Sequence, residues 1–137
     1  MNFLSSLTPK NEVDYISYEA SLLKTLQMMQ HRNYAAIPII NKAGEYVGTI
    51  TSGDILGFIK ENFDLSLKAA ADQPLSSIKR TRDNKAVRIS ATMEEILEAA
   101  MSQNFVPVVD DQKKFIGIIT RQGIMKCLTE NGNKKDS

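Results

Sequence analysis

Apolar residues recur along the chain in two short runs that resemble each other. Ala36 to Ile40 reads Ala-Ile-Pro-Ile-Ile and Phe105 to Val109 reads Phe-Val-Pro-Val-Val, so the second proline follows the first by 69 positions (107 − 38). The same offset aligns Tyr46 to Thr51 with Phe115 to Thr120, glycine on glycine and threonine on threonine. A fixed period that keeps register over several segments marks an internal repeat. The chain therefore contains two copies of one unit.

Each copy begins with a strand signal followed by a helical pattern. Short strands are expected at Val13 to Ser17 and at Ala86 to Ser90. The helices that follow carry apolar residues at spacings of three and four, namely Leu22, Leu26 and Met29 in the first copy and Met93, Leu97, Ala100 and Met101 in the second. Thr92 and Glu95 have the spacing of a helix capping box. These stripes predict helices with one face in a core.

Two further strands and a closing helix complete each copy. The strands are joined by turn-forming residues at Asn41 to Gly44 and at Asp110 to Lys114. The closing helices carry Ile55, Leu56 and Ile59 in the first copy and Ile124, Met125 and Leu128 in the second. Each copy thus reads β-α-β-β-α. This order predicts an α+β fold in which the two copies pack sheet against sheet around a pseudo-twofold axis.

The repeat divides the chain into four expected segments. The first repeat covers 7–61 and the second covers 75–129. Between them, 62–74 reads as a helical connector, because Leu65 to Ala71 favours a helix and Pro74 ends it. The polar stretch 130–137 is expected to be a disordered tail.

Composition excludes several classes of function. With 17 basic and 16 acidic residues the net charge is +1, so nothing favours duplex nucleic acid or an anionic membrane surface. No apolar run approaches the roughly 20 residues of a membrane span, and the N-terminus does not resemble a signal peptide, so a cytoplasmic protein is expected. Cys127 and His31 are the chain's one cysteine and one histidine. Without a nucleophile-base pair or a metal cluster, we expect no enzyme, no catalytic residue, no metal and no catalytic cofactor.

The order of motifs resembles one protein family in particular. In both copies a helix precedes an apolar-Pro-apolar strand, a turn, and a Gly-x-x-Thr strand that runs into a helix. This pattern, found twice between Leu7 and Leu128, resembles the cystathionine-β-synthase (CBS) domain family, whose tandem pairs are called Bateman modules. The Leu-Thr-Pro-Lys segment at Leu7 to Lys10 looks like that of free-standing bacterial modules. The resemblance implies a cleft between the repeats that holds AMP, ATP, S-adenosylmethionine or cyclic di-adenosine monophosphate (cyclic di-AMP).

In such modules a Gly-x-x-Thr-x-x-Asp motif contacts the ligand, and it is present here at 48–54. The resemblance assigns the ribose hydroxyls to the Asp54 carboxylate. It assigns phosphate oxygens to the Thr51 hydroxyl and to amides at the helix N-terminus, which suit an anion. The alternative is that Ser52 caps the helix and Asp54 only complements its dipole.

A second contact region is implied around the purine. The residues concerned enter the first strand or begin the next one, and they are Val13, Asp14, Tyr34, Ala35, Ala36, Ile37 and Pro38. A mostly apolar slot with a few backbone donors and acceptors suits an adenine ring. The alternative is an ordinary buried strand, above all for Ile37 and Ile39.

The second repeat departs from the family pattern. It has Gly123 where the first repeat has Asp54, which leaves open whether it holds a ribose. Instead it offers Arg121 beside Thr120, and a guanidinium group binds phosphate well. The basic run immediately before the first strand of this repeat adds three possible phosphate contacts, Lys79, Arg80 and Arg82. The alternative for these three residues is a solvated surface.

Together these features predict a regulatory sensor of adenine nucleotides. It would bind an adenine nucleotide or a cyclic dinucleotide, form a homodimer and act on a separate effector protein, with no role for nucleic acid or membrane. The alternative is a dimerisation or assembly module that needs no ligand. A change in melting temperature with an adenine nucleotide would distinguish the two.

Overall fold

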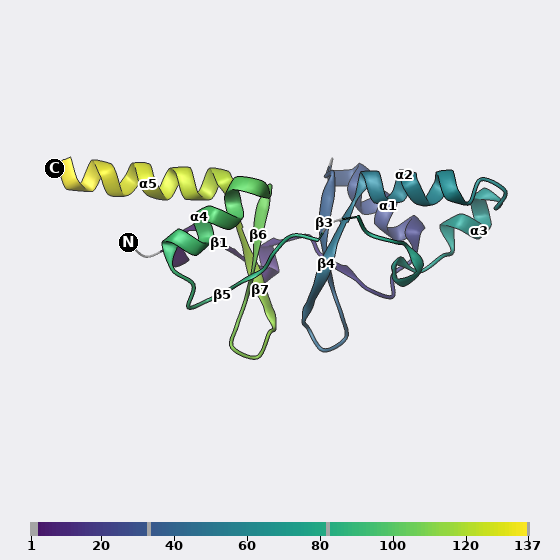
Figure 1. The fold of residues 1–137 in the computed structure, drawn as a ribbon, viewed down its shortest axis with the longest axis horizontal. Helices are drawn as coiled ribbons and strands as arrows, with labels where there is room; N and C mark the ends of the chain where they lie inside the picture. Colours follow the sequence, from purple (N-terminus) through teal and green to yellow (C-terminus); the bar gives the residue numbers. More distant parts are fainter. Residues whose placement is uncertain (1–2, 33, 82, 137) are drawn as a thin grey trace. The chain divides into compact units, whose positions relative to one another are not determined.

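The structure is a computed structural model that describes residues 3–32, 34–81 and 83–136 (Figure 1). The chain forms two compact units, one of residues 14–83 and the other of residues 1–13 with 84–137. Each unit contains one β-α-β-β-α repeat around its own sheet. The predicted α+β fold with two repeats is therefore confirmed.

The unit of residues 14–83 is built on a three-stranded sheet. Its elements are β2 (Ile16–Ser17), α1 (Leu22–Arg32), β3 (Ala36–Ile40), β4 (Tyr46–Thr51), α2 (Ser52–Glu61), α3 (Leu67–Ala71) and the 3-10 helix η3 (Leu75–Ser77). The strand order is β2-β3-β4, with β2 parallel and β4 antiparallel to β3. Ile37, Ile39 and Ile50 are fully buried at the centre of its core. The connector predicted between the repeats contains α3.

The other unit has the same plan with one additional strand. Its elements are the 3-10 helices η1 (Phe3–Ser6) and η2 (Lys10–Glu12), β1 (Leu7–Pro9), β5 (Val87–Arg88), α4 (Met93–Ser102), β6 (Phe105–Val109), β7 (Phe115–Thr120) and α5 (Arg121–Asp136). The strand order is β1-β7-β6-β5. Val106, Val108 and Ile119 lie at the centre of the core. Helix α5 continues past Leu128 into the stretch where the sequence suggests a tail.

The segment that precedes the first strand of each repeat lies against the last strand of the other repeat. β1 pairs antiparallel with β7, with Leu7 opposite Ile119 and Pro9 opposite Gly117. In the first repeat, the Asp83 carboxylate accepts a hydrogen bond from the Thr49 N–H at 3.0 Å. A Cβ atom at Gly117 would collide with the Thr8 carbonyl, and one at Gly48 would collide with Asp83 and Arg80. The glycine shared by the two motifs is thus required by a close approach of backbone or side chain.

The helical stripes are only partly buried within the chain. Leu22 and Met29 lie in the core as predicted, whereas Leu26 is partly exposed. In α4 the buried face consists of Ile96, Ala99 and Ala100, so the prediction that Leu97 and Met101 face the core is wrong. Met101 is 82% exposed, and in the closing helices Leu56 and Met125 are 66% and 67% exposed. The helices therefore carry apolar side chains that their own units do not cover.

Candidate functional site

Asp54 lies at the beginning of α2, where it forms a capping box with Thr51. The Thr51 Oγ1 accepts a hydrogen bond from the Asp54 N–H at 3.1 Å, and the Asp54 Oδ2 accepts one from the Thr51 N–H at 3.0 Å. The helix cap is thus Thr51, and the suggestion that Ser52 fills this role is wrong. This reciprocal pair fixes the Asp54 side chain against the first turn of α2.

The second oxygen of Asp54 binds Thr81, in the segment that leads to the first strand of the second repeat. Asp54 Oδ1 accepts hydrogen bonds from the Thr81 N–H at 3.0 Å and from the Thr81 hydroxyl at 2.9 Å. The Asp54 residue is only 3% exposed. Burial by itself raises the pKa of this carboxyl, but the hydrogen bonds from Thr81 and Thr51 outweigh burial and hold the pKa below its ordinary value. Asp54 is therefore an ionised acceptor at neutral pH.

A pocket of about 400 Å³ adjoins this carboxylate. One face of α2 and the segment 73–81 line it, and Asp54, Lys79 and Thr81 are among the lining residues. Its volume is in the range of small-molecule sites. The exposed Lys79, predicted as a phosphate contact, thus shares a pocket with the predicted ribose acceptor.

Two of the residues predicted around the purine, Ala35 and Ala36, lie at the adjoining end of the sheet. Ala36 pairs with Thr51 across β3 and β4, and the Ala35 carbonyl accepts a hydrogen bond from the Ser52 N–H at 3.0 Å. These contacts place Ala35 and Ala36 beside the Thr51 cap. Ile37 and Pro38 are buried further along β3.

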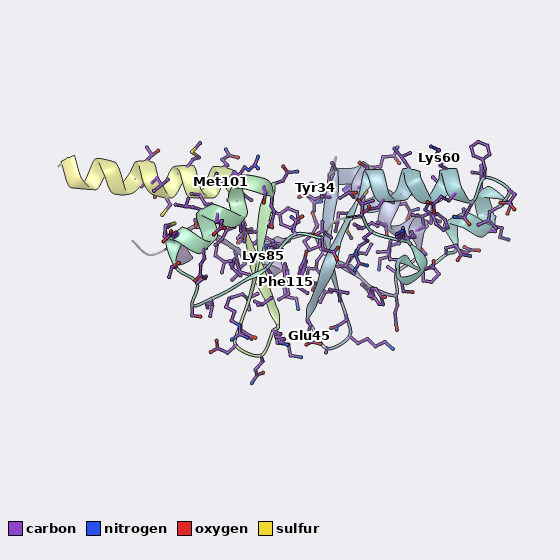
Figure 2. The ribbon with its side chains drawn as sticks, viewed as in Figure 1. Tyr34, Glu45, Lys60, Lys85, Met101 and Phe115 are labelled. Carbon is purple, nitrogen blue, oxygen red and sulfur yellow. The ribbon has the colours of Figure 1, made fainter. Side chains whose placement is uncertain are left out.

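Tyr34 and Asp14 form a small polar cluster with Arg32. The Arg32 Nε lies 3.3 Å from the Asp14 Oδ2, and Asp14 is also close enough to the Tyr34 hydroxyl to affect its pKa. Partial burial, followed by the Asp14 contact, raises the pKa of Tyr34. Figure 2 shows Tyr34 at the end of β3 that lies away from the turn carrying Glu45. Val13 belongs to the other unit, where its N–H donates to the Lys10 carbonyl.

The arginine of the basic run has a partner within the fold. Arg80 donates from Nε to Asp83 Oδ1 at 2.7 Å and from Nη2 to Asp83 Oδ2 at 3.3 Å. The Arg80 side chain is 18% exposed. The hydrogen bonds to Asp83 outweigh burial and raise the pKa of Arg80. Arg82 lies outside the described residues.

In the second repeat, Arg121 binds the end of a helix. Its Nε donates to the Ala100 carbonyl at 2.7 Å, and its Nη2 donates to the Met101 carbonyl at 3.1 Å. These carbonyls belong to the last turn of α4, where a cation is favourable. The Thr120 Oγ1 accepts a hydrogen bond from the Gly123 N–H at 2.9 Å, so Thr120 is the counterpart of Thr51.

Sequence reasoning did not identify Thr81 and Asp83 as important residues. Both lie in or next to the basic run, where the charges of the neighbouring residues drew attention to phosphate binding instead. Thr81 contacts Asp54 from 27 positions away, and no local periodicity reveals such a contact. Within residues 3–32, 34–81 and 83–136, no three histidine, cysteine or acidic side chains could hold a metal ion. No helix in these ranges is long and apolar enough to cross a membrane.

Comparison with known proteins identifies the repeat. A family model described as CBS domain matches residues 4–61 and again residues 75–130. No curated protein matches the chain.

Solved structures share the whole architecture. A CBS domain protein from Streptococcus pneumoniae TIGR4 is 28% identical, with a TM-score of 0.80 over 93% of this chain and 90% of that one. CbpB in complex with c-di-AMP is 23% identical, with a TM-score of 0.87 over 99% of this chain and 90% of that one. CBSX2 in complex with AMP is 19% identical, with a TM-score of 0.75 over 96% of this chain and 98% of that one. The last two likenesses concern the fold.

Proposed function

The chain belongs to the CBS domain family, and from this premise we propose that it is a regulatory module that binds an adenosine-containing nucleotide. Two proteins of the same fold are complexed with c-di-AMP and with AMP, and both ligands contain adenosine. The ligand class of the proposal is therefore AMP, ATP, S-adenosylmethionine or cyclic di-AMP. The ligand acts as a regulator, not as a catalytic cofactor.

The observation that carries the proposal is the ionised Asp54 carboxylate beside a pocket. An ionised carboxylate has about four lone-pair positions, and three are used by the donors of Thr51 and Thr81. A ribose hydroxyl can donate to the remaining position or replace the Thr81 hydroxyl. Hydrogen bonds to an ionised acceptor are stronger than neutral ones, so this group suits a sugar with two adjacent hydroxyls.

The neighbouring residues suit the rest of an adenosine nucleotide. Ala35 and Ala36 provide small apolar side chains and backbone groups beside Thr51, which favours a flat purine. Lys79 lines the pocket and supplies a cation for a phosphate. Arg80 and Arg121 already bind protein groups, which favours Lys79 as the principal phosphate contact.

Binding at Asp54 also provides a route for regulation. Thr81 belongs to the segment that leads to the first strand of the second repeat, and it is held to α2 through Asp54. A ligand that competes for this carboxylate changes the free energy of that contact. The bound and free protein then differ in the population of conformations, and a separate partner protein recognises the difference.

A thermal-shift panel tests the proposal. AMP, ATP, S-adenosylmethionine and cyclic di-AMP are compared with GMP and cyclic di-GMP on the wild type. At least one adenine compound is expected to raise the melting temperature more than its guanine counterpart, because binding to the folded state stabilises it. The shift should be reduced in Asp54→Asn and retained in the matched control Asp64→Asn, whose side chain is exposed in the connector. No shift with any adenine compound would contradict the proposal.

The exposed helical residues favour a second candidate, an assembly module that needs no ligand. Leu56 and Met125, at equivalent positions of α2 and α5, are largely exposed in the single chain. Apolar side chains of this kind are typical of an interface. A stable homodimer whose melting temperature does not change with any nucleotide in the panel would favour assembly over sensing.

A further inference from the structure

The two repeats have the same helix cap but different space beside it. In each repeat a threonine hydroxyl accepts the N–H of the residue three positions later, Asp54 in the first and Gly123 in the second. The backbone that would present a ribose-binding acid is therefore present twice. Only the side chain is missing at Gly123.

The N-terminal segment of the chain occupies the space at Gly123. The Ser6 carbonyl oxygen lies 3.2 Å and the Ser6 Cβ lies 3.7 Å from the position that a Cβ on residue 123 would take. One turn further along α5, the Cys127 Sγ is hydrogen bonded to the Ser5 Oγ at 3.7 Å. Ser5 and Ser6 thus lie against the same face of α5.

The strand that follows keeps this segment in place. β1 begins directly after Ser6 and pairs with β7 along three residues, up to Pro9 opposite Gly117. Strand pairing on one side and α5 on the other determine where Ser6 lies. A Cβ atom on residue 123 would require Ser6 or the Thr120 hydroxyl to shift slightly, and a carboxylate that extends further towards Ser6 would crowd this backbone, which is costly in a packed contact.

In the first repeat, the equivalent position, Asp54, has different neighbours. There the incoming segment presents an N–H and a hydroxyl, both from Thr81, to the carboxylate. At Gly123 the incoming segment presents a carbonyl oxygen, which would repel a carboxylate instead of donating to it. The neighbours of position 54 therefore favour a carboxylate, whereas those of position 123 disfavour one and also leave less space for it.

We propose that Ser5 and Ser6 occupy the ribose position of the second repeat, so that each chain anchors a single adenosine. This inference rests on the proposed function, because it assumes that Asp54 is the position that anchors ribose. It also explains why glycine stands at position 123. A larger side chain would meet the Ser6 backbone, and restoring an acid there would not restore a ribose site.

A disulfide across this contact tests the proposal in the full chain. The 3.7 Å separation between the two Cβ positions is within the range of about 3.5 to 4.5 Å for disulfides. Ser6→Cys and Gly123→Cys are combined with Cys127→Ser, which removes the competing thiol and keeps a partner for Ser5. The matched control places the second cysteine at Glu130, seven residues along α5 and about 10 Å away.

Under mild oxidation the 6–123 pair is expected to cross-link almost completely, and the 6–130 pair is expected to cross-link little. Calorimetric titration with AMP, which carries one adenosine, should give at most one bound nucleotide per chain for the wild type, for Gly123→Asp and for the oxidised variant, and cyclic di-AMP should not exceed one molecule per chain. Failure of the 6–123 pair to cross-link would overturn the proposal. Binding of a second AMP by Gly123→Asp would overturn it too. So would a second AMP that binds to the reduced 6–123 variant and is lost when the disulfide forms. Efficient cross-linking with no nucleotide bound by any form would refute the proposed function and leave the contact of Ser6 with α5 established.

Discussion

The Asp54 carboxylate is shared between the fold and the proposed ligand. Three protein donors use it in the structure, two from Thr81 and one from Thr51. A substitution here therefore affects stability as well as binding. Asp54→Asn keeps the shape and one acceptor, so it separates the two effects better than Asp54→Ala.

Asp54→Ala is predicted to lower the free energy of unfolding by about 1 to 3 kcal/mol, because it leaves buried donors unpaired. Asp64→Ala, an exposed position in the connector, should change it by about 0.5 kcal/mol or less. Urea denaturation followed by circular dichroism measures both. Equal stability of the two variants would mean that the Asp54 contacts do not support the fold.

The lowered pKa of Asp54 predicts a pH dependence of stability. Since the folded pKa lies below the ordinary value of 3.8, this group stabilises the fold fully above about pH 5 and loses that contribution as the pH falls through the folded pKa. The difference in unfolding free energy between the wild type and Asp54→Asn should therefore shrink from pH 6 towards pH 3. Denaturant titrations at several pH values measure it. A difference that grows as the solution becomes more acidic would contradict the assigned hydrogen bonds.

At the level of single residues, the sequence predicts which side chains are important better than it predicts which residues they contact. Asp54 and Thr51 follow from a motif with fixed spacing, and the structure places both at one helix cap. The contacts of Thr81 and Ser6 could not be predicted, because each is made with a residue far away in the sequence that belongs to the other repeat. The positive charge of Arg121 follows from the sequence. Its hydrogen bonds to carbonyls of α4 could not be predicted, because they depend on the end of a helix 20 positions away.

Among the elements, β4 is held by the segment that crosses it at Gly48. Gly48→Ala is predicted to lower the free energy of unfolding by about 1 to 3 kcal/mol, because the new methyl group overlaps Asp83 and Arg80. Gly57→Ala, on α2 with no atom near its Cβ position, should leave stability unchanged or raise it by up to about 1 kcal/mol. Thermal unfolding of both variants measures the contrast. A Gly48→Ala protein as stable as Gly57→Ala would show that the crossing segment does not lie against β4.

The order of elements was predictable from the sequence, but their exposure was not. The strands and helices of both repeats follow from runs and periodicities that do not depend on the rest of the chain. Periodicity identifies an apolar stripe without saying what covers it. Ile55 and Leu56 are adjacent in sequence, yet one is buried and the other is 66% exposed.

For the whole molecule, the uncovered helical side chains predict a homodimer. Leu56, Met101 and Met125 are each at least 66% exposed, and burying such residues against a second copy is favourable. Light scattering after size-exclusion chromatography should give the mass of two chains at micromolar concentration. Replacing Leu56 and Met125 together by glutamate should shift the mass towards one chain. A monomer mass for the wild type, with and without nucleotide, would contradict this prediction.

If the first repeat anchors an adenosine nucleotide through Asp54, calorimetric titration will show it as a loss of affinity when this carboxylate is replaced. Cyclic di-AMP and AMP are titrated into the wild type, Asp54→Asn and the control Asp64→Asn, each first shown to be folded. At least one of the two nucleotides is expected to bind saturably to the wild type and to Asp64→Asn. In Asp54→Asn the affinity should be lower by roughly tenfold or more, because a hydrogen bond to a charged acceptor is lost. Folded wild type that binds neither nucleotide, or Asp54→Asn that binds as tightly as the wild type, would contradict the claim.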